Sequence, residues 1–268
     1  MASDREMLRV VWEEKLPVCF QLHQSDADIQ IPEPLYLMVP RLSYFPLVTD
    51  KVRKHFKKYI SPDKQDAEMW LDYDGNPLQW HYPIGVLFDI FESDIQLPWV
   101  INVRFDNFPE QKLLHCPSKE YVESHFLSSL KEADVMKHKT QIVTNMQKKD
   151  HHQLWLGLQN DKFDQFWAVN RKLMESGPDE CFKNIPFKLY FREEHYVQKL
   201  VKPVHQEVKR KTFGDFINEV VPASVDMSSF KILIHGIEVP HETPLQWMSE
   251  HLSYPDNFLH FVISSKCK

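Results

Sequence analysis

Short runs of β-prone residues alternate with helical patterns near both ends of the chain. In the N-terminal part, the runs Val18–His23 and Leu35–Tyr44 are rich in strand-forming residues and carry prolines only at their edges. A helical pattern opens at Asp50, where apolar residues recur every three or four positions. The pattern predicts two strands followed by a helix.

A second strand pair is predicted directly after this helix. Met69–Tyr73 and Leu78–Tyr82 are β-prone and flank an Asp-Gly-Asn turn, which is typical of a hairpin. A short helix over Ile84–Phe91 and a strand over Trp99–Phe105 complete the set. This order of elements is that of the β-grasp fold of ubiquitin, in which a sheet packs its apolar face on one helix.

The C-terminal third repeats the same order. Phe187–Phe191 and Val197–Val201 are predicted to be strands, and Thr212 with Asp215 resembles a capping box that opens the helix Phe213–Val221. The later elements are the strand Lys231–His235, a short helix around Leu245–His251 and the strand Phe258–Ile263. We therefore expect a second ubiquitin-like unit.

The middle of the chain, from Ser118 to Met174, contains no proline and repeats apolar residues at helical spacing. A short amphipathic helix is also expected before Pro17. The predicted fold class is α+β, with two ubiquitin-like β-grasp domains flanking a helix-rich domain. The predicted divisions are residues 1–107, which include the N-terminal helix, residues 108–184 and residues 185–268.

Composition narrows the function. The chain has 268 residues and a formal net charge of -6, so no global attraction to nucleic acid is expected. Its four cysteines are scattered, which favours reduced thiols in a cytoplasmic protein. A signal peptide and a bilayer-spanning apolar run are both missing from the sequence, so membrane contact would be peripheral.

Catalytic motifs are not evident. The six glycines form no phosphate-binding fingerprint, and the fourteen histidines show no zinc spacing, so no cofactor is expected. A cysteine-dependent ligase would have to use Cys116 beside His115, but neighbouring side chains often diverge, and buried thiols are commonly inert. The chain ends in Ser264–Lys268, without the C-terminal glycine that a transferable modifier needs. An acceptor or scaffold is favoured.

Several longer tracts resemble one known family. These are Asp50–Val52, Trp80–Gly85, Leu113–Lys119, Lys131–Asp134, His151–Trp155, Asp164–Trp167 and His251–His260. They are closely similar to the autophagy protein 5 family, and the resemblance extends from Trp12 to Ile263. Members of this family have two ubiquitin-like domains around a helix-rich one, which agrees with the order of elements described above.

The resemblance implies a non-catalytic scaffold. Family members accept a ubiquitin-like modifier, autophagy protein 12, on one lysine of a Lys-Glu-Ala-Asp tract, which here is Lys131. They also bind the N-terminal helix of a coiled-coil partner, autophagy protein 16. The assembly works with a lipid-transfer E2 enzyme and acts like an E3 ligase, attaching autophagy protein 8 to phosphatidylethanolamine at the phagophore membrane.

Helical geometry is compatible with Lys131 as an acceptor. At about 100° per residue, Lys131 lies opposite the apolar face of its helix, so its amine would be exposed. Lys139 is also predicted to point outward, and geometry therefore does not single out one lysine. The apolar face comprises Val122, Phe126, Ser129, Ala133 and Met136.

The partner helix is expected to contact the Trp80–Gly85 tract, in a helix-in-groove mode. Its candidate contact residues are Trp80, Tyr82, Pro83, Ile84 and Gly85. The alternative is that Trp80 and Tyr82 are strand residues that face the core. On the first reading, Gly85→Glu abolishes partner binding and leaves the fold intact.

Two locally basic groups are candidates for contact with anionic lipid. One comprises Lys137, Lys139, Lys148 and Lys149, and the other comprises Lys209, Arg210 and Lys211. The alternative for both groups is an ordinary solvated charged face.

Overall fold

The computed structural model describes residues 2–28, 31–91, 96–138, 141–174, 181–192, 196–205, 209–222 and 229–266. The chain forms two compact units. The first unit comprises residues 14–87 and 94–123, and the second comprises residues 1–13, 88–93 and 124–268. The predicted divisions at 107 and 184 do not coincide with these units and stay predictions.

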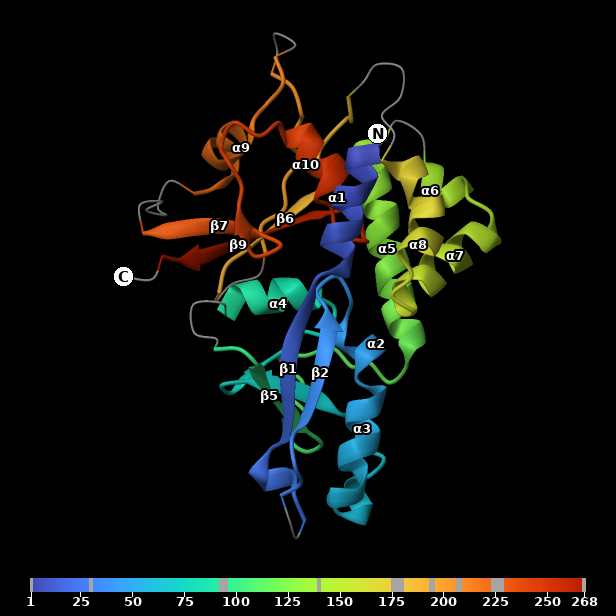
Figure 1. Ribbon diagram of the computed structural model, residues 1–268, viewed down its shortest axis with the longest axis vertical. Coiled ribbons are helices and arrows are strands. Elements are labelled where there is room, and N and C mark those ends of the chain that lie inside the picture. Colours follow the sequence, from blue (N-terminus) through green and yellow to red (C-terminus); the bar gives the residue numbers. More distant parts are fainter. Residues whose placement is uncertain are drawn as a thin grey trace. The chain divides into compact units, whose positions relative to one another are not determined.

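The first unit contains a five-stranded mixed sheet with the order β2-β1-β5-β3-β4 (Figure 1). Its central strands, β1 and β5, run parallel, and the other neighbours are antiparallel. Parallel pairing of the first and last strands is a feature of the predicted β-grasp arrangement. The strands are β1 (Lys15–Leu22), β2 (Leu35–Pro40), β3 (Trp70–Tyr73), β4 (Asn76–Pro77) and β5 (Trp99–Arg104).

Apolar side chains from helices cover one face of this sheet. Phe45 packs against Phe20 of β1 and Trp99 of β5, with ring centroids 6.3 Å and 5.9 Å apart. The helices of this region are α2 (Phe45–Val48), α3 (Asp50–Phe56) and the start of α4 (Ile84–Phe91), with 3-10 turns at Gln24–Asp26, Lys57–Tyr59 and Pro62–Lys64.

The predicted hairpin is only partly correct. Its turn is the pair Asp74 and Gly75, which have φ values of 48° and 74° and therefore connect the strands in two residues. The predicted strand over Leu78–Tyr82 is wrong, because the chain leaves the sheet after Pro77 and forms a turn in which Tyr82 donates its N–H to the carbonyl of Gln79. Similarly, β2 ends at Pro40 and does not continue to Tyr44.

The second unit contains a four-stranded sheet with the order β6-β9-β7-β8, again with its first and last strands parallel. Phe216 of α9 packs on Phe187 of β6 and Phe261 of β9, at centroid distances of 4.8 Å and 5.0 Å. The capping box of Thr212 and Asp215 is confirmed. The elements are β6 (Phe187–Tyr190), α9 (Phe213–Val220), β7 (Phe230–Ile234), β8 (Ile237–Glu238), α10 (Leu245–His251) and β9 (Leu259–Ser265).

The predicted strand Val197–Val201 is not a regular strand. It contacts the segment before it through isolated antiparallel bridges, Leu189 to Val197 and Ile185 to Val201. The residues between the bridges, Gln198 to Leu200, are extended but form no continuous ladder.

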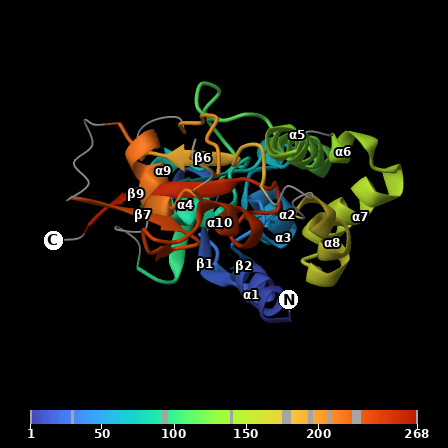
Figure 2. The same ribbon diagram turned by 90° about the horizontal axis from the view of Figure 1, so that it is seen from above.

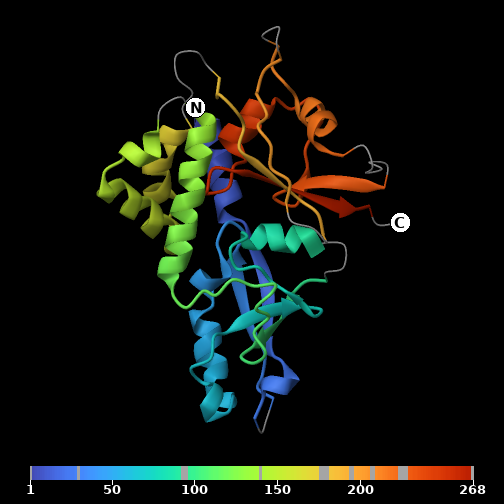
Figure 3. The ribbon, with the colours of Figure 1, turned by 180° about the vertical axis from the view of Figure 1, so that it is seen from behind.

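The helical part is built around α5, which runs without a break in the view from behind (Figure 3). Phe126 of α5 lies 6.3 Å from Trp155 and 6.4 Å from Phe166 between ring centroids, and α6 to α8 gather beside α5 in Figure 2. The helices are α1 (Ala2–Glu13), α5 (Lys119–Lys137), α6 (Ile142–Asn145), α7 (Lys148–Gln159) and α8 (Phe163–Asn170), followed by a 3-10 turn at Arg171–Leu173.

The N-terminal helix α1 packs on α8. Trp12 lies 4.9 Å from Phe166 between ring centroids, and Arg5 and Arg9 donate to the carboxylate of Asp164 at 2.8 Å and 2.6 Å.

The two β-grasp sheets and the helical region confirm the predicted α+β fold class. Among the described residues, none of the helices has the length and apolar composition needed to cross a bilayer.

Candidate functional site

Lys131 is exposed on the outer face of α5. The opposite face is fully buried at Phe126, Leu130 and Ala133, as the apolar spacing predicts. Farther along the helix, Ala133 and Met136 pack in one cluster with Phe258. The expected exposure of Lys131 is thus confirmed, whereas its role as an acceptor stays a prediction.

A mainly apolar hollow of about 480 Å³ lies next to Lys131. Val135 and Leu200 line it and expose 49% and 70% of their surface. Gln198 donates from its Nε2 to Glu132 at 2.7 Å, linking the two sides. The complete lining is Lys131, Glu132, Val135, Met136, Gln198, Lys199 and Leu200, and we call it the acceptor hollow.

Lys137, two turns beyond Lys131, is only 1% exposed. Its Nζ lies 3.4 Å from Sδ of Met174 and 4.9 Å from the ring centre of Phe182. Burial lowers the pKa of Lys137 to about 7, while Glu250, Asp256 and Asp134 oppose that shift. The expectation that Lys137 contributes to a basic surface is wrong, because α5 turns this side chain into the core.

The other basic candidates differ from one another. Lys148 and Lys149 are exposed at the start of α7, and Lys209 and Arg210 are exposed before α9. Lys211 pairs with Glu219 of α9, so its charge is partly compensated. Lys139 lies outside the described residues.

The Trp80–Gly85 tract is largely buried. Trp80 is half-buried and donates from Nε1 to the carbonyl of Leu114 at 2.7 Å, whereas Tyr82, Pro83, Ile84 and Gly85 are buried. The structure thus favours the core-facing alternative for Tyr82, although this residue lies in a turn and not in a strand. Partner contact by these five residues stays a prediction, and it would require their surroundings to move.

Gly85 is needed for a close backbone approach within the first unit. Its N–H donates to the carbonyl of Arg41 at 2.7 Å, and an added Cβ would lie 3.1 Å from both that oxygen and Cβ of Arg41. A glutamate at this position would therefore displace the Arg41 backbone. This close contact argues against an intact fold in Gly85→Glu, and the stability of that variant stays a prediction.

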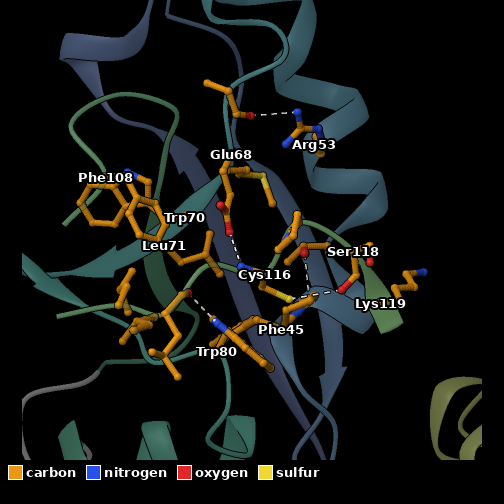
Figure 4. A pocket seen from close by; sticks show the side chains of 18 of the residues that line it. Phe45, Arg53, Glu68, Trp70, Leu71, Trp80, Phe108, Cys116, Ser118 and Lys119 are labelled. Atoms are coloured by element: carbon orange, nitrogen blue, oxygen red, sulfur yellow. Dashed lines mark hydrogen bonds between the residues drawn. The ribbon is translucent and has the colours of Figure 1, made fainter. Parts of the chain in front are cut away.

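A cavity of about 560 Å³ lies within the first unit. Figure 4 shows the side chains that line it. Aromatic and aliphatic side chains, including Trp70, Trp80 and Phe108, form much of its wall. The segment from Phe108 to Lys119 closes one side, and Lys119 at its end pairs with Asp50 at 2.6 Å.

His115 fastens this segment. Its Nδ1 lies 2.6 Å from Glu68 and its Nε2 lies 2.9 Å from Glu110, while its ring stacks on Phe108 at a centroid distance of 4.3 Å. These two carboxylates, Glu68 first, raise the pKa of His115 above its ordinary value. The sequence did not reveal this contact, because Glu68 and His115 are 47 positions apart.

The environment of Cys116 opposes nucleophilic activation. Burial, with a smaller contribution from the charge of Glu68, raises the pKa of this thiol to about 12. Its Sγ lies 3.6 Å from the carbonyl oxygen of Ser118, and the ring nitrogens of His115 bind the two carboxylates instead. The thiol is therefore held in the protonated form at neutral pH, which disfavours the ligase alternative.

A second apolar groove, of about 450 Å³, occurs in the second unit. Met7 of α1, Ile237 of β8 and Trp247 of α10 contribute to it, and Ile237 is 54% exposed. Val239, Pro240, Thr243, Pro244, Leu252 and Glu238 complete the lining, and we call it the α1–α10 groove. Sequence analysis missed it, since Met7 and Trp247 are distant in the chain.

Over the residues that the structure describes, no group of three or more His, Cys, Asp or Glu side chains is placed to hold a metal ion. The described site is therefore an exposed lysine with two apolar surfaces in the second unit. Two ubiquitin-like folds joined to a helical bundle define the class of protein.

Three family models match the chain. Residues 11–105 match "Autophagy protein ATG5, UblA domain", residues 119–176 match its alpha-helical bundle region and residues 184–263 match its UblB domain. The chain therefore belongs to the autophagy protein 5 family and has a role in autophagy.

Relatives match over nearly the full length. "Autophagy protein 5" of Drosophila melanogaster is 51% identical over 269 residues, covering 99% of each chain. "Autophagy-related protein 5" of Caenorhabditis elegans is 35% identical and covers 97% of this chain and 98% of its own. The crystal structure of Kluyveromyces marxianus Atg5 has a TM-score of 0.81 at 18% identity, covering 97% of this chain and 100% of its own, and supports the fold.

Proposed function

We propose that this protein is a non-catalytic acceptor and scaffold, conjugated through an isopeptide bond on Lys131 to the ubiquitin-like autophagy protein 12. The observation that carries the proposal is the exposure of Lys131 within its Lys-Glu-Ala-Asp tract, opposite the buried face of α5. An acceptor amine must reach a thioester held by another protein, and a side chain on this face has the necessary access.

The scaffold also binds the N-terminal helix of a coiled-coil partner, autophagy protein 16. The α1–α10 groove is a better candidate for this contact than the Trp80–Gly85 tract. It is apolar and open, and it exposes Ile237, whereas Tyr82, Pro83, Ile84 and Gly85 are buried. An amphipathic helix with its apolar face in such a groove buries anchor side chains at helical spacing.

The conjugate would act like an E3 ligase without chemistry of its own. It would bring the lipid-transfer E2 enzyme and its autophagy protein 8 cargo to phosphatidylethanolamine at the phagophore membrane. The high pKa of Cys116 supports a scaffold over a cysteine ligase. The cytoplasmic protein would contact the membrane peripherally, and exposed Lys148, Lys149, Lys209 and Arg210 are available for anionic lipid.

A reconstituted lipidation assay tests this function. Vesicles that contain phosphatidylethanolamine would receive the activating and transfer enzymes, an autophagy protein 8 and ATP, with either the conjugate or the unconjugated chain. The proposal expects faster lipidation with the conjugate, and it expects Cys116→Ser to keep that rate. Equal rates with and without the conjugate would refute the E3-like role, and loss of activity in Cys116→Ser would favour the ligase alternative.

A further inference from the structure

The acceptor hollow exposes apolar side chains beside the one lysine that the proposed function uses. Val135 follows Lys131 by one helical turn, and Leu200 faces it from the extended segment before α9. Met136 also lines the hollow and is nearly buried. The two exposed side chains, Val135 and Leu200, give another molecule an apolar surface to pack on, directly beside the amine of Lys131.

Hydrogen bonds fix both walls of the hollow. On the far wall, Val197 and Leu189 exchange backbone hydrogen bonds of 2.8 Å and 2.9 Å, and Ile185 donates to Val201 at 2.8 Å. These bonds hold residues 198–200 in an extended conformation. The near wall is α5 itself.

A side-chain bond joins the two walls. Nε2 of Gln198 donates to Oε1 of Glu132 at 2.7 Å, and the same nitrogen lies 3.8 Å from Sδ of Met136. The carboxylate of Glu132 is therefore engaged beside Lys131. A side-chain hydrogen bond therefore links the two walls of the hollow next to the acceptor lysine.

We propose that the acceptor hollow receives the carboxy-terminal tail of the ubiquitin-like modifier during transfer, with an apolar tail side chain packed on Val135 and Leu200. This inference rests on the proposed function, in which Lys131 is the acceptor. A modifier tail must end in glycine, and the carbonyl of that glycine must reach Nζ of Lys131, which itself lines the hollow.

Chain dimensions make this occupant specific. Four residues separate Lys131 from Val135, a rise of about 6 Å along the helix axis, and an extended chain advances about 3.3–3.6 Å per residue. The residue about two positions before the glycine therefore lies over the hollow. A tail arriving elsewhere would leave Lys131 accessible but would not cover Leu200.

The transfer step itself needs no group from the hollow. The neutral amine of Lys131 attacks the thioester carbonyl, an amide C–N bond forms and the C–S bond to the transfer enzyme's cysteine breaks. The amine gives up one proton, and the departing thiolate takes one up. Val135 and Leu200 are positioning residues, which raise the time that the tail spends near the amine.

Single-turnover transfer from a preloaded modifier–enzyme thioester to the full chain tests the proposal. We expect Leu200→Ser and the double variant Val135→Ser with Leu200→Ser to raise the thioester concentration for half-maximal rate. The double variant should show about a tenfold increase, equivalent to about 1.4 kcal/mol, with little change in the rate at saturation. Met38→Ser, which alters an exposed apolar residue of β2 in the first unit, is the matched control and should behave as wild type.

The outcomes separate this inference from the proposed function. If Lys131→Arg abolishes transfer while both hollow variants transfer at wild-type half-saturation, the hollow has no role and only the inference fails. If Lys131→Arg still accepts the modifier normally, the proposed function fails first. If size-exclusion chromatography shows that Leu200→Ser converts a dimer into a monomer, the hollow binds a second copy of the chain, which overturns the inference. Because Leu200 is largely exposed, the single variant Leu200→Ser should fold normally, and a change in its transfer kinetics therefore reports on the hollow itself.

Discussion

Nδ1 of His115 lies 2.6 Å from Oε2 of Glu68, and this contact fastens the segment that closes the cavity of the first unit. On the other side of the ring, Nε2 lies 2.9 Å from Glu110. A carboxylate only accepts hydrogen bonds, so both ring nitrogens must donate, and the ring is the imidazolium form. The raised pKa of His115 has the same cause.

This geometry predicts a pH-dependent stability. The folded-state pKa of His115 is raised, so the stabilisation is complete below about pH 6.5 and is lost as pH rises through the raised value. The free energy of unfolding, measured in urea between about pH 6 and pH 9, should be larger for wild type than for His115→Gln. This difference should be largest at low pH and should disappear at high pH.

Glu110→Gln provides the control. Glu110 is exposed, and its substitution removes one of the two carboxylates that contact His115 while Glu68 stays in place. An NMR titration should show a lower pKa for His115 in this variant than in wild type. A pKa of His115 at or below about 6.5 in wild type would contradict the contact.

Buried Lys137 predicts the opposite trend with pH. Burial lowers the pKa of Lys137 to about 7, so between about pH 7 and its ordinary value of about 10.4 the unfolded chain binds the extra proton. This lysine therefore costs stability at pH 7, and the cost shrinks as pH rises, by at most about 1.4 kcal/mol per pH unit. Lys137→Met, which keeps a similar volume, should be more stable than wild type at pH 7, with a gap that narrows by pH 10.

The measurement is the free energy of unfolding of wild type and of Lys137→Met, obtained by denaturant titration at several pH values. Lys149→Met is the matched control, since Lys149 is exposed on α7 and should show no such trend. Destabilisation by Lys137→Met at pH 7 would mean that its contacts with Phe182 and nearby carboxylates outweigh its burial.

Close approaches at three glycines predict a ranking of alanine variants. An added Cβ would lie 2.7 Å from the backbone nitrogen of Phe166 at Gly157, 3.1 Å from Arg41 at Gly85 and 3.3 Å from His241 at Gly214. Overpacking costs about 1–3 kcal/mol, partly offset in a helix by about 1 kcal/mol of propensity. Unfolding free energies should fall most for Gly157→Ala, less for Gly85→Ala and least for Gly214→Ala.

Gly85→Glu should be less stable than Gly85→Ala, because it also places a carboxylate in a buried position. Weak partner binding by this variant would therefore reflect local unfolding. If Gly85→Glu unfolds like wild type and still fails to bind the partner peptide, the original surface prediction for the Trp80–Gly85 tract gains direct support.

The α1–α10 groove predicts a separable docking defect. Ile237→Asp places a charge in the middle of its apolar lining and should weaken binding of the partner's N-terminal helix at least about tenfold in calorimetry. Leu200→Asp changes an even more exposed apolar residue, which lies in the acceptor hollow, and this variant should bind the partner helix normally. Equal affinity for Ile237→Asp and wild type would place the partner helix elsewhere.

Much of the fold was predictable because local patterns and packing agree. Thr212 and Asp215 form the capping box that their spacing predicts, and the apolar face of α5 is buried at Phe126 and Ala133. The strand predicted over Leu78–Tyr82 is wrong, because pairing in the sheet ends at Pro77 although the residues that follow are β-prone. β-propensity depends on neighbouring strands, which the sequence of one segment does not contain.

The site was predictable only where one helix determines it. The exposure of Lys131 follows from helical spacing alone, and so does the burial of Lys137, which lies four residues after Ala133 on the same face. That second signal was present in the sequence and was outweighed by the charge of the residue. Leu200 and Glu68 depend on contacts between distant segments, and no local pattern identifies them.

Mass spectrometry after conjugation tests the central claim most directly. The full chain would be incubated with the modifier, its activating and transfer enzymes and ATP, as wild type, Lys131→Arg and the exposed control Lys149→Arg. The account predicts one adduct on wild type and Lys149→Arg, mapped by peptide analysis to Lys131, and none on Lys131→Arg. An adduct that persists on Lys131→Arg, or that is distributed over several lysines of wild type, would contradict it.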